Sequence, residues 1–433
     1  MELTWHSCRC KIMHGGFCMY FHEGEFGLPG LLLMELESWR TSPLAREFPY
    51  SGVVRYIRSV GKHFLAEPVV EALVQVRAAQ SEWTGDEESR SHLRRFLSVV
   101  LDKRDGTYDY ATYTALGLLR PPAAAPLPDF EAEIGTRIAF LIYDALAFEC
   151  GAALGYRSQL PCMRPPRDAV EKRLRHGLRV ATEMDAFNSK PITPRVSGLQ
   201  ERFDQLIDVL EGAPSGMATR LDQTILPVYI IHDEYLFIRV LQSFESIFEH
   251  LARLASEAIV RLEARETEEA LLLLSSIARV LSLGLPLFSL LATMQRESFE
   301  FFRKFTEGAS AIQSVNYKTF EALCGTPAPA RVESAAFQSV PEVRGRVLGS
   351  MTTVRGAADA LIASTPHDPE AEARLTRAMA HIEAVHQRWK RTHYRLAVRM
   401  IGSVSGTGYT AGTPYLRSVI DNRLFRRAEE TTY

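Results

Sequence analysis

Apolar residues recur every three to four positions along most of the 433 residues of this chain. This spacing places them on one face of an α-helix, so the pattern predicts a largely helical protein. Strict alternation of apolar and polar residues, which is typical of half-buried β-strands, is nearly absent. The periodic segments predict helices at residues 53–65, 68–78, 91–101, 130–154, 169–184, 199–210, 245–264, 268–288 and 389–401. We therefore expect an all-α fold.

The length of the chain exceeds the usual size of one domain, so we expect more than one unit. Residues 121–128 read PPAAAPLP and predict a stiff, extended connector, because proline fixes its own φ and restricts the residue before it. Further breaks in the helical pattern fall at residues 161–166, 327–341 and 364–369. We predict an N-terminal tail at residues 1–48, an added helical region at 49–213 and a second helical domain at 214–433.

Composition narrows the class of protein only slightly. The chain is 46% apolar and 24% charged, values that are typical of globular proteins. Its net charge of −2 gives no electrostatic reason to expect a nucleic acid or an anionic membrane as partner. We identify no apolar run long enough to span a bilayer and no signal peptide. The six scattered cysteines indicate a reducing compartment, so we expect a cytoplasmic protein.

The predicted tail contains several side chains that are able to bind zinc, namely Cys8, Cys10, His14, Cys18 and His22. However, a C-x-C pair followed by single ligands is not a standard zinc spacing. Metal binding and a tail without a metal both remain open. No C-x-x-C-H motif occurs, so covalent attachment of haem is not supported.

A single histidine is the main candidate for chemistry in the C-terminal part. Residues 388–417 read RWKRTHYRLAVRMIGSVSGTGYTAGTPYLR, and helical spacing places Trp389, His393 and Met400 on one face. Gly402 is expected to end this helix in a left-handed turn. A neutral imidazole on an apolar wall can bind a haem iron, and a following loop of small residues can close over a substrate. The alternative is a core histidine followed by a surface loop.

Three tyrosines in the added region, Tyr108, Tyr110 and Tyr113, are close in sequence. They are candidates for an aromatic pocket. Such a cluster is more often part of a core or an interface.

The segment around His393 resembles the haem-ligand segment of the tryptophan 2,3-dioxygenase family. In that family a tryptophan and the iron-binding histidine precede an Arg-Ile-Gly-like helix end and a GTGG-type loop. Trp389, His393, Gly402 and Thr407 are the counterparts here, whereas Tyr409 replaces a glycine of the loop. The resemblance implies haem b with its iron on His393, Trp389 beside the cofactor, and Thr407 near the ammonium group of the substrate.

A second segment, residues 217–254, resembles the first substrate-pocket region of the same family. The match includes the run His-Asp-Glu-x-Leu-Phe-Ile that ends at Ile238. Leu241 occupies the position of the family's distal histidine, and Ala218 occupies that of a pocket tyrosine. Leucine accepts no hydrogen bond, so the family's contact with an indole N–H is lost or replaced. We expect Asp233 and Glu234 to lie at the N-terminus of a helix, where the helix dipole stabilises negative charge, rather than to act in catalysis.

A third segment, residues 299–325, resembles the family's Phe-Arg…Ser-Gly-Phe-Gln-Ser signature. Phe299 and Arg303 match the residues that hold the substrate ring and its carboxylate, and Ser310 lies in the matched part. Arginine suits a carboxylate because its planar guanidinium makes paired hydrogen bonds. The resemblance also implies that Phe237, Leu241 and Phe299 face the aromatic ring.

Taken together, the resemblance implies an oxidoreductase with a helical-bundle haem domain at residues 214–433. It implies oxygen insertion into L-tryptophan or a substituted tryptophan, with dioxygen or hydrogen peroxide as oxidant. Leu241 and Thr407 are the predicted catalytic positions, and a homo-oligomer is expected. Hydroxylation of a tyrosine-like amino acid in natural-product biosynthesis is one alternative. The other alternative is a non-catalytic sensor of haem or of an amino acid.

Overall fold

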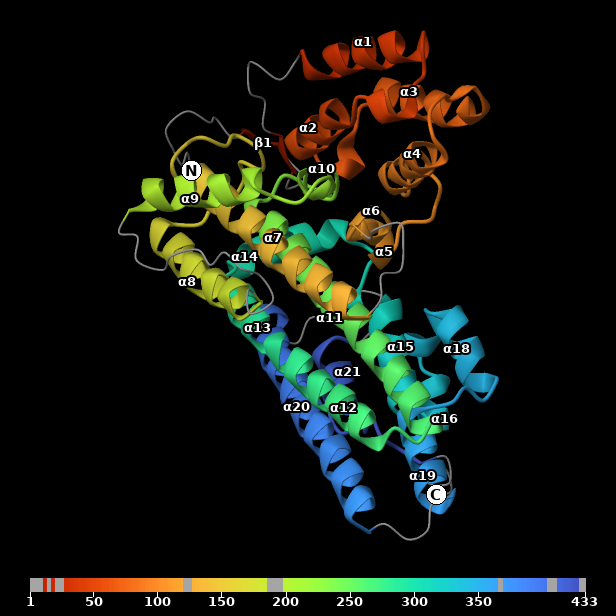
Figure 1. Cartoon of the computed structure of the whole chain (residues 1–433). Helices are drawn as coiled ribbons and strands as arrows, with labels where there is room; N and C mark the ends of the chain where they lie inside the picture. The colour runs from red at the N-terminus through yellow and green to blue at the C-terminus, as the bar shows by residue number, and fades with distance from the viewer. Residues whose placement is uncertain are drawn as a thin grey trace.

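The computed structural model of this chain describes residues 11–13, 17–19, 27–119, 127–184, 198–364, 369–402 and 411–427. The expected all-α class is confirmed (Figure 1). A small antiparallel hairpin of β1 (Lys11–Met13) and β2 (Phe17–Met19) is the exception among these residues. Of the tail residues considered for zinc, Cys8, Cys10, His14 and His22 lie outside the described residues.

The helices before residue 214 are α1 (Leu28–Arg40), α2 (Tyr50–Val60), α3 (Glu67–Ala78), α4 (Glu87–Val100), α5 (Tyr110–Tyr113), α6 (Leu116–Leu119), α7 (Leu127–Ala153), α8 (Arg167–Met184) and α9 (Leu199–Glu211). Those after it are α10 (Met217–Gln223), α11 (His232–Glu263), α12 (Thr267–Leu283), α13 (Leu285–Leu291), α14 (Arg296–Phe302), α15 (Val315–Cys324), α16 (Pro329–Val332), α17 (Ala335–Gln338), α18 (Pro341–Leu348), α19 (Val354–Ser364), α20 (Pro369–Ile401) and α21 (Thr413–Ser418). Short 3₁₀ turns include η5 (Arg303–Phe305) and η6 (Ala311–Gln313).

Two long helices begin earlier than the periodicity predicts. Helix α11 starts at His232 rather than at residue 245, and α20 starts at Pro369 rather than at residue 389. In its first turns α11 buries polar side chains such as Asp233 and Glu234. The sequence there therefore lacks the regular spacing of apolar residues that predicts a buried helix face. The predicted helix at 268–288 is instead divided, because Gly284 caps α12 and α13 begins with a proline in its first turn.

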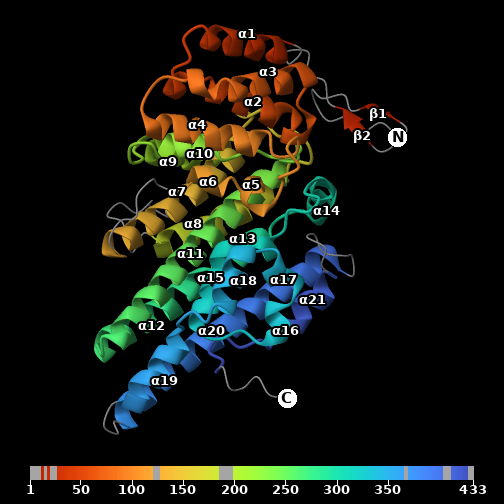
Figure 2. The ribbon, with the colours of Figure 1, turned by 90° about the vertical axis from the view of Figure 1, so that its right-hand side faces the viewer.

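Helices α1 to α4 supply most of a smaller core at one end of the molecule, to which Leu118 of α6 and Leu226 also belong (Figures 1 and 2). Leu36, Val53, Leu73 and Phe96 are buried in it, one from each helix. Helix α1 lies within the range predicted as a tail, where it packs against α2 and α3. The segment from residue 28 onwards therefore belongs to this helical core.

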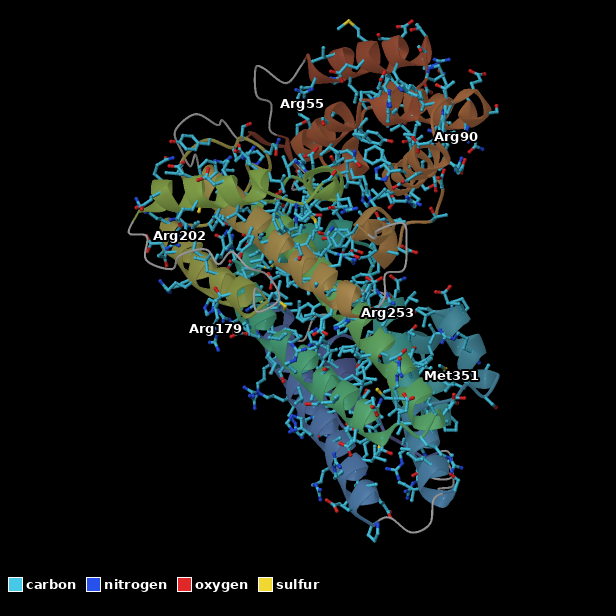
Figure 3. The ribbon with its side chains drawn as sticks, viewed as in Figure 1. Arg55, Arg90, Arg179, Arg202, Arg253 and Met351 are labelled. Atoms are coloured by element: carbon cyan, nitrogen blue, oxygen red, sulfur yellow. The ribbon has the colours of Figure 1, made fainter. Side chains whose placement is uncertain are left out.

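The larger core is arranged around α11, which packs against α7, α12, α15 and α19. Helices α7 and α8 precede residue 214, yet they share this core with helices that follow it. The boundary between the two hydrophobic cores therefore does not lie at residue 214. Figure 3 shows side chains filling the space between the ribbons, with Arg55 and Arg90 at the end formed by α1 to α4 and Arg253 and Met351 towards the other end.

Helices α12 and α13 together, Thr267–Leu291, are long and apolar enough to cross a membrane, by length and composition alone. The expectation that no apolar run reaches this length is therefore wrong. Leu274, Ile277 and Leu281 are buried in the larger core, where α12 packs against α11 and α20. Much of the apolar character of α12 is thus explained by contacts between helices.

Candidate functional site

A cavity of about 300 Å³ lies among α11, α13, α14, α15 and α20. Aromatic and aliphatic side chains form most of its wall. On α11 the lining residues are Phe237, Leu241, Phe244, Glu245 and Phe248, which share one helical face. Phe237, Leu241, Phe299, Arg303, Ser310, Trp389 and His393 all line this cavity, so the structure brings together every described residue that the sequence predicted for the site.

His393 reaches the cavity from α20, and its ring stacks on that of Phe288 with 5.7 Å between the ring centroids. Burial lowers the pKa of its imidazole to about 4, so the ring is neutral near pH 7. No described residue forms a hydrogen bond with it. A neutral imidazole has a nitrogen lone pair available for a metal, which is the requirement for an axial haem ligand.

Trp389 lies one turn before His393 on α20 and lines the same cavity beside it. Its ring contacts Phe244, Phe248 and Phe288 at centroid distances of 6.0, 5.7 and 5.3 Å. Its indole N–H is buried and has no hydrogen-bond partner among the described residues. The aromatic wall beside His393 suits a flat, apolar ligand such as a tetrapyrrole.

His386 is a second cavity histidine on α20 and is not among the residues predicted from the sequence. Its Nε2 lies 2.9 Å from the hydroxyl oxygen of Tyr317. Burial lowers its pKa to about 3. The spacing of seven residues from His393 would have placed both histidines on one face, which is the signal that was available in the sequence.

Arg303 and Phe299 enter the cavity from α14 and the following turn. Phe299 packs on Phe237 with ring centroids 5.4 Å apart. Arg303 is half-buried at the end of α14, and burial lowers the pKa of its guanidinium. A cation beside an apolar wall can bind the carboxylate of an aromatic amino acid while the wall holds its ring.

The position of α14 depends on a buried ionic network. Asp233 accepts a hydrogen bond from the backbone N–H of Gln295 at 2.7 Å, just before α14 begins. Arg173 of α8 donates to Asp233 and to Glu149 of α7, both at 2.7 Å. All three charged side chains are fully buried. Asp233 thus lies in the first turn of α11, as expected, but its main partners are Arg173 and the segment before α14.

The tyrosines of the added region also contribute to the site. Tyr110 and Tyr113 of α5 line the cavity, whereas Tyr108 is not part of its wall. The side-chain oxygen of Gln313 accepts hydrogen bonds from the backbone N–H groups of Tyr110 and Ser310, each at 3.1 Å. This shared acceptor joins α5 to the turn that carries Ser310. The predicted helical region at 49–213 therefore supplies part of the cavity wall.

The wall of this cavity does not include Ala218. Ala218, expected at the place of a pocket tyrosine, lines a different and smaller pocket. Thr407 lies outside the described residues. The preceding helix ends at Ile401, and Gly402 follows with φ of +57°, which confirms the left-handed turn predicted there.

No family model matches the chain. Comparison with curated proteins finds tryptophan 2,3-dioxygenases at low identity. The enzyme from Anaeromyxobacter sp. (strain K) is 27% identical over 220 residues, which cover 44% of this chain and 82% of the relative. The enzyme from Nocardioides sp. is 29% identical over 215 residues, covering 43% and 79%. That from Bacillus anthracis is 24% identical over 229 residues, covering 45% and 81%.

These relatives match the C-terminal part of this chain, about 45% of its length. The resemblance predicted from the sequence lies in the same part. They support the expectation of an oxidoreductase of the oxygenase type. The C-terminal part of this chain is thus similar, at low identity, to the tryptophan 2,3-dioxygenases.

Proposed function

We propose that this chain is a haem-dependent oxygenase that inserts oxygen into the aromatic ring of L-tryptophan or a substituted tryptophan. The observation that carries this proposal is the meeting of three separate segments in one cavity, through His393, Arg303 and Leu241. They combine an imidazole with an available lone pair, a cation for a carboxylate and an apolar surface for a ring. The likeness to the tryptophan 2,3-dioxygenases supports the same function.

The described residues fit haem b. In bound haem, the iron supplies the chemistry that activates dioxygen or hydrogen peroxide. His393 would bind that iron, and Trp389 would pack beside it. Polar groups form only a small part of the cavity wall, so the bound substrate would be largely shielded from water.

The substrate would be oriented by its amino-acid group and by its ring. Arg303 would pair with the carboxylate, Ser310 is also in the cavity wall, and Thr407 is proposed near the ammonium group. Phe237 and Phe299 would hold the ring against Leu241. Such positioning lowers the entropic cost of bringing the ring to the oxidant.

Hydroxylation of a tyrosine-like amino acid is the second candidate, and two observations favour it. Leu241 offers no hydrogen-bond acceptor for an indole N–H. Tyr110 and Tyr113, in contrast, are phenols in the cavity wall, which are able to exchange hydrogen bonds with a polar ring substituent.

Product analysis separates these functions. Haem-loaded protein would be incubated with L-tryptophan, 3-methyltryptophan and L-tyrosine, each with dioxygen and a reductant or with hydrogen peroxide, and the products identified by mass spectrometry. Oxygenated tryptophans are expected. Hydroxylated tyrosine as the sole product would favour the second candidate. Haem binding without turnover of any substrate would contradict both and favour a sensor.

A further inference from the structure

Besides Arg303, the charged side chains of the cavity wall include Glu245, Lys390 and Arg423. A further three, Lys318, Glu321 and Arg331, form one cluster. All three are nearly fully buried. Charged groups are costly to remove from water unless a partner of opposite charge compensates them. The pairing within this cluster therefore shows which of the three charges is compensated by a partner in the protein.

Glu321 and Arg331 compensate each other. Arg331 donates from Nε and Nη2 to the two carboxylate oxygens of Glu321, at 2.8 and 2.9 Å. A third hydrogen bond runs from Nη1 of Arg331 to the hydroxyl of Tyr415 at 3.0 Å. Burial raises the pKa of Glu321, but the charges of Arg331 and Lys318 and the hydrogen bond from Arg331 together outweigh burial and lower the pKa to about 2. The pair is thus ionised and carries no net charge.

Lys318 is the member of the cluster without a partner at hydrogen-bond distance among the described residues, although the carboxylates of Glu321 and Glu245 both raise its pKa. Its side chain is only 3% exposed, and its Nζ lies 3.8 Å from Glu321, too far for a hydrogen bond. No described residue accepts a hydrogen bond from this ammonium group. Its surroundings also include two ring faces, with Nζ 4.8 Å from the centroid of Tyr317 and 5.8 Å from that of Phe337. Burial lowers the pKa of Lys318 to about 8, as expected for a cation without sufficient compensation.

The place of Lys318 relates it to the iron site. The neighbouring Tyr317 stacks on Trp389 with centroids 5.8 Å apart, and Trp389 contacts His393 at 5.6 Å. Arg303 already provides a cation for the single carboxylate of an amino acid. Haem b carries two propionate carboxylates on the edge of an otherwise apolar ring, so a further cation at the wall of its cavity is able to pair with one of them.

We propose that Lys318 binds a propionate carboxylate of the haem held in this cavity. This inference rests on the proposed function, because it requires that the cavity holds haem. The ammonium group would donate hydrogen bonds to the carboxylate and so fix the rotation of the ring about the axis through the iron. The apolar remainder of the ring would lie against Trp389 and Phe288.

The test compares haem with its dimethyl ester, in which both propionates are uncharged. Full-length protein produced without haem would be titrated with each compound, and binding would be measured by the Soret absorbance. The variants are Lys318→Met and Lys318→Arg, with Lys172→Met, an exposed lysine of α8, as the control. Circular dichroism would establish that each variant is folded.

Lys318→Met should weaken haem binding about tenfold or more, the scale of one charge-assisted hydrogen bond, while ester binding stays within about twofold. Lys318→Arg should keep the preference for haem, and the control should match the wild type. Equal loss for haem and ester, or no loss for either, would overturn the inference and leave the proposed function intact. If the wild-type protein binds neither compound, the proposed function itself fails, and this inference fails with it.

Discussion

The hydroxyl oxygen of Tyr317 lies 2.9 Å from Nε2 of His386, so one of the two cavity histidines of α20 already has a protein partner. His393, two turns later, has none among the described residues. A metal ligand needs a free lone pair on one ring nitrogen. Nδ1 of His386 also has no partner among the described residues, so the two histidines form a matched pair for mutation. We expect His393 to bind the iron because it lies in the segment that resembles the haem-ligand segment of the tryptophan 2,3-dioxygenases.

Replacement of these histidines by alanine should have different effects on haem. His393→Ala should lose most of the haem, or keep haem with a spectrum that lacks histidine ligation. His386→Ala should retain a histidine-ligated spectrum, although loss of the buried contact with Tyr317 should lower the free energy of unfolding by about 1–3 kcal/mol. Absorption spectra of the purified variants provide the measurement. A normal spectrum in His393→Ala with loss in His386→Ala would reverse the assignment.

Replacement of Arg303 tests the carboxylate site. Arg303→Leu should weaken binding of the aromatic amino acid by roughly 2 kcal/mol, the lower end of the range for truncating one member of a charge pair, because Arg303 is only half-buried. The haem spectrum should not change. Lys304→Leu, the adjacent exposed residue, serves as control. Equal affinities of Arg303→Leu and wild type in a spectral titration would show that the carboxylate binds elsewhere.

Replacement of Leu241 tests what lies opposite the substrate ring. Leucine accepts no hydrogen bond, so the wild-type protein should lose little when the indole nitrogen is methylated. Turnover of 1-methyltryptophan relative to tryptophan should therefore be much higher in the wild type than in Leu241→His. In the variant, methylation removes the hydrogen bond that the new imidazole would accept, at a cost of about 1–3 kcal/mol. Complete loss of wild-type turnover on methylation would mean that another group accepts the bond.

Replacement of Arg173 tests the network that holds the start of α14. Arg173→Met leaves Glu149 and Asp233 buried without their cation, so the free energy of unfolding should fall by about 3–5 kcal/mol. Urea unfolding provides the measurement. Arg179→Met removes an exposed arginine of the same helix and should change stability by less than about 1 kcal/mol. Similar losses in both variants would argue against a special role for the network.

Glu234 should make stability depend on pH. Burial raises its pKa from 4.5 to about 8, although its carboxylate accepts hydrogen bonds from the backbone N–H groups of Val228 and Tyr229. Because the folded pKa is above the unfolded value, its contribution to stability is fully present below pH 4.5 and is lost as pH rises through about 8.

The comparison with Glu234→Gln isolates this effect, because glutamine does not titrate. Between pH 5 and 8, chosen to lie within that window, the wild type should lose on the order of 3 kcal/mol of unfolding free energy relative to the variant. Chemical denaturation at several pH values provides the measurement. A difference that is constant with pH, or that grows in the opposite direction, would show that Glu234 is ionised in the folded protein.

The sequence alone was sufficient for features that depend on neighbouring residues. Helical periodicity, the glycine turn at Gly402 and the common face of Trp389 and His393 are local properties, and the structure contains all of them. The likeness of three collinear segments also placed Phe299, Arg303 and Leu241 in one expected site. The structure places these residues around one cavity.

Contacts between distant segments were decided only by the tertiary structure. Arg173 and Asp233 meet across 60 positions, and Tyr110 reaches Gln313 across 203. Nothing in the local pattern distinguishes Tyr110, which lines the cavity, from Tyr108, which does not. The pairing of Glu321 with Arg331, which leaves Lys318 without a partner at hydrogen-bond distance among the described residues, likewise depends on how α15 and α16 pack. Burial and charge pairing follow from the packing of whole helices, because each depends on which surfaces are removed from water together.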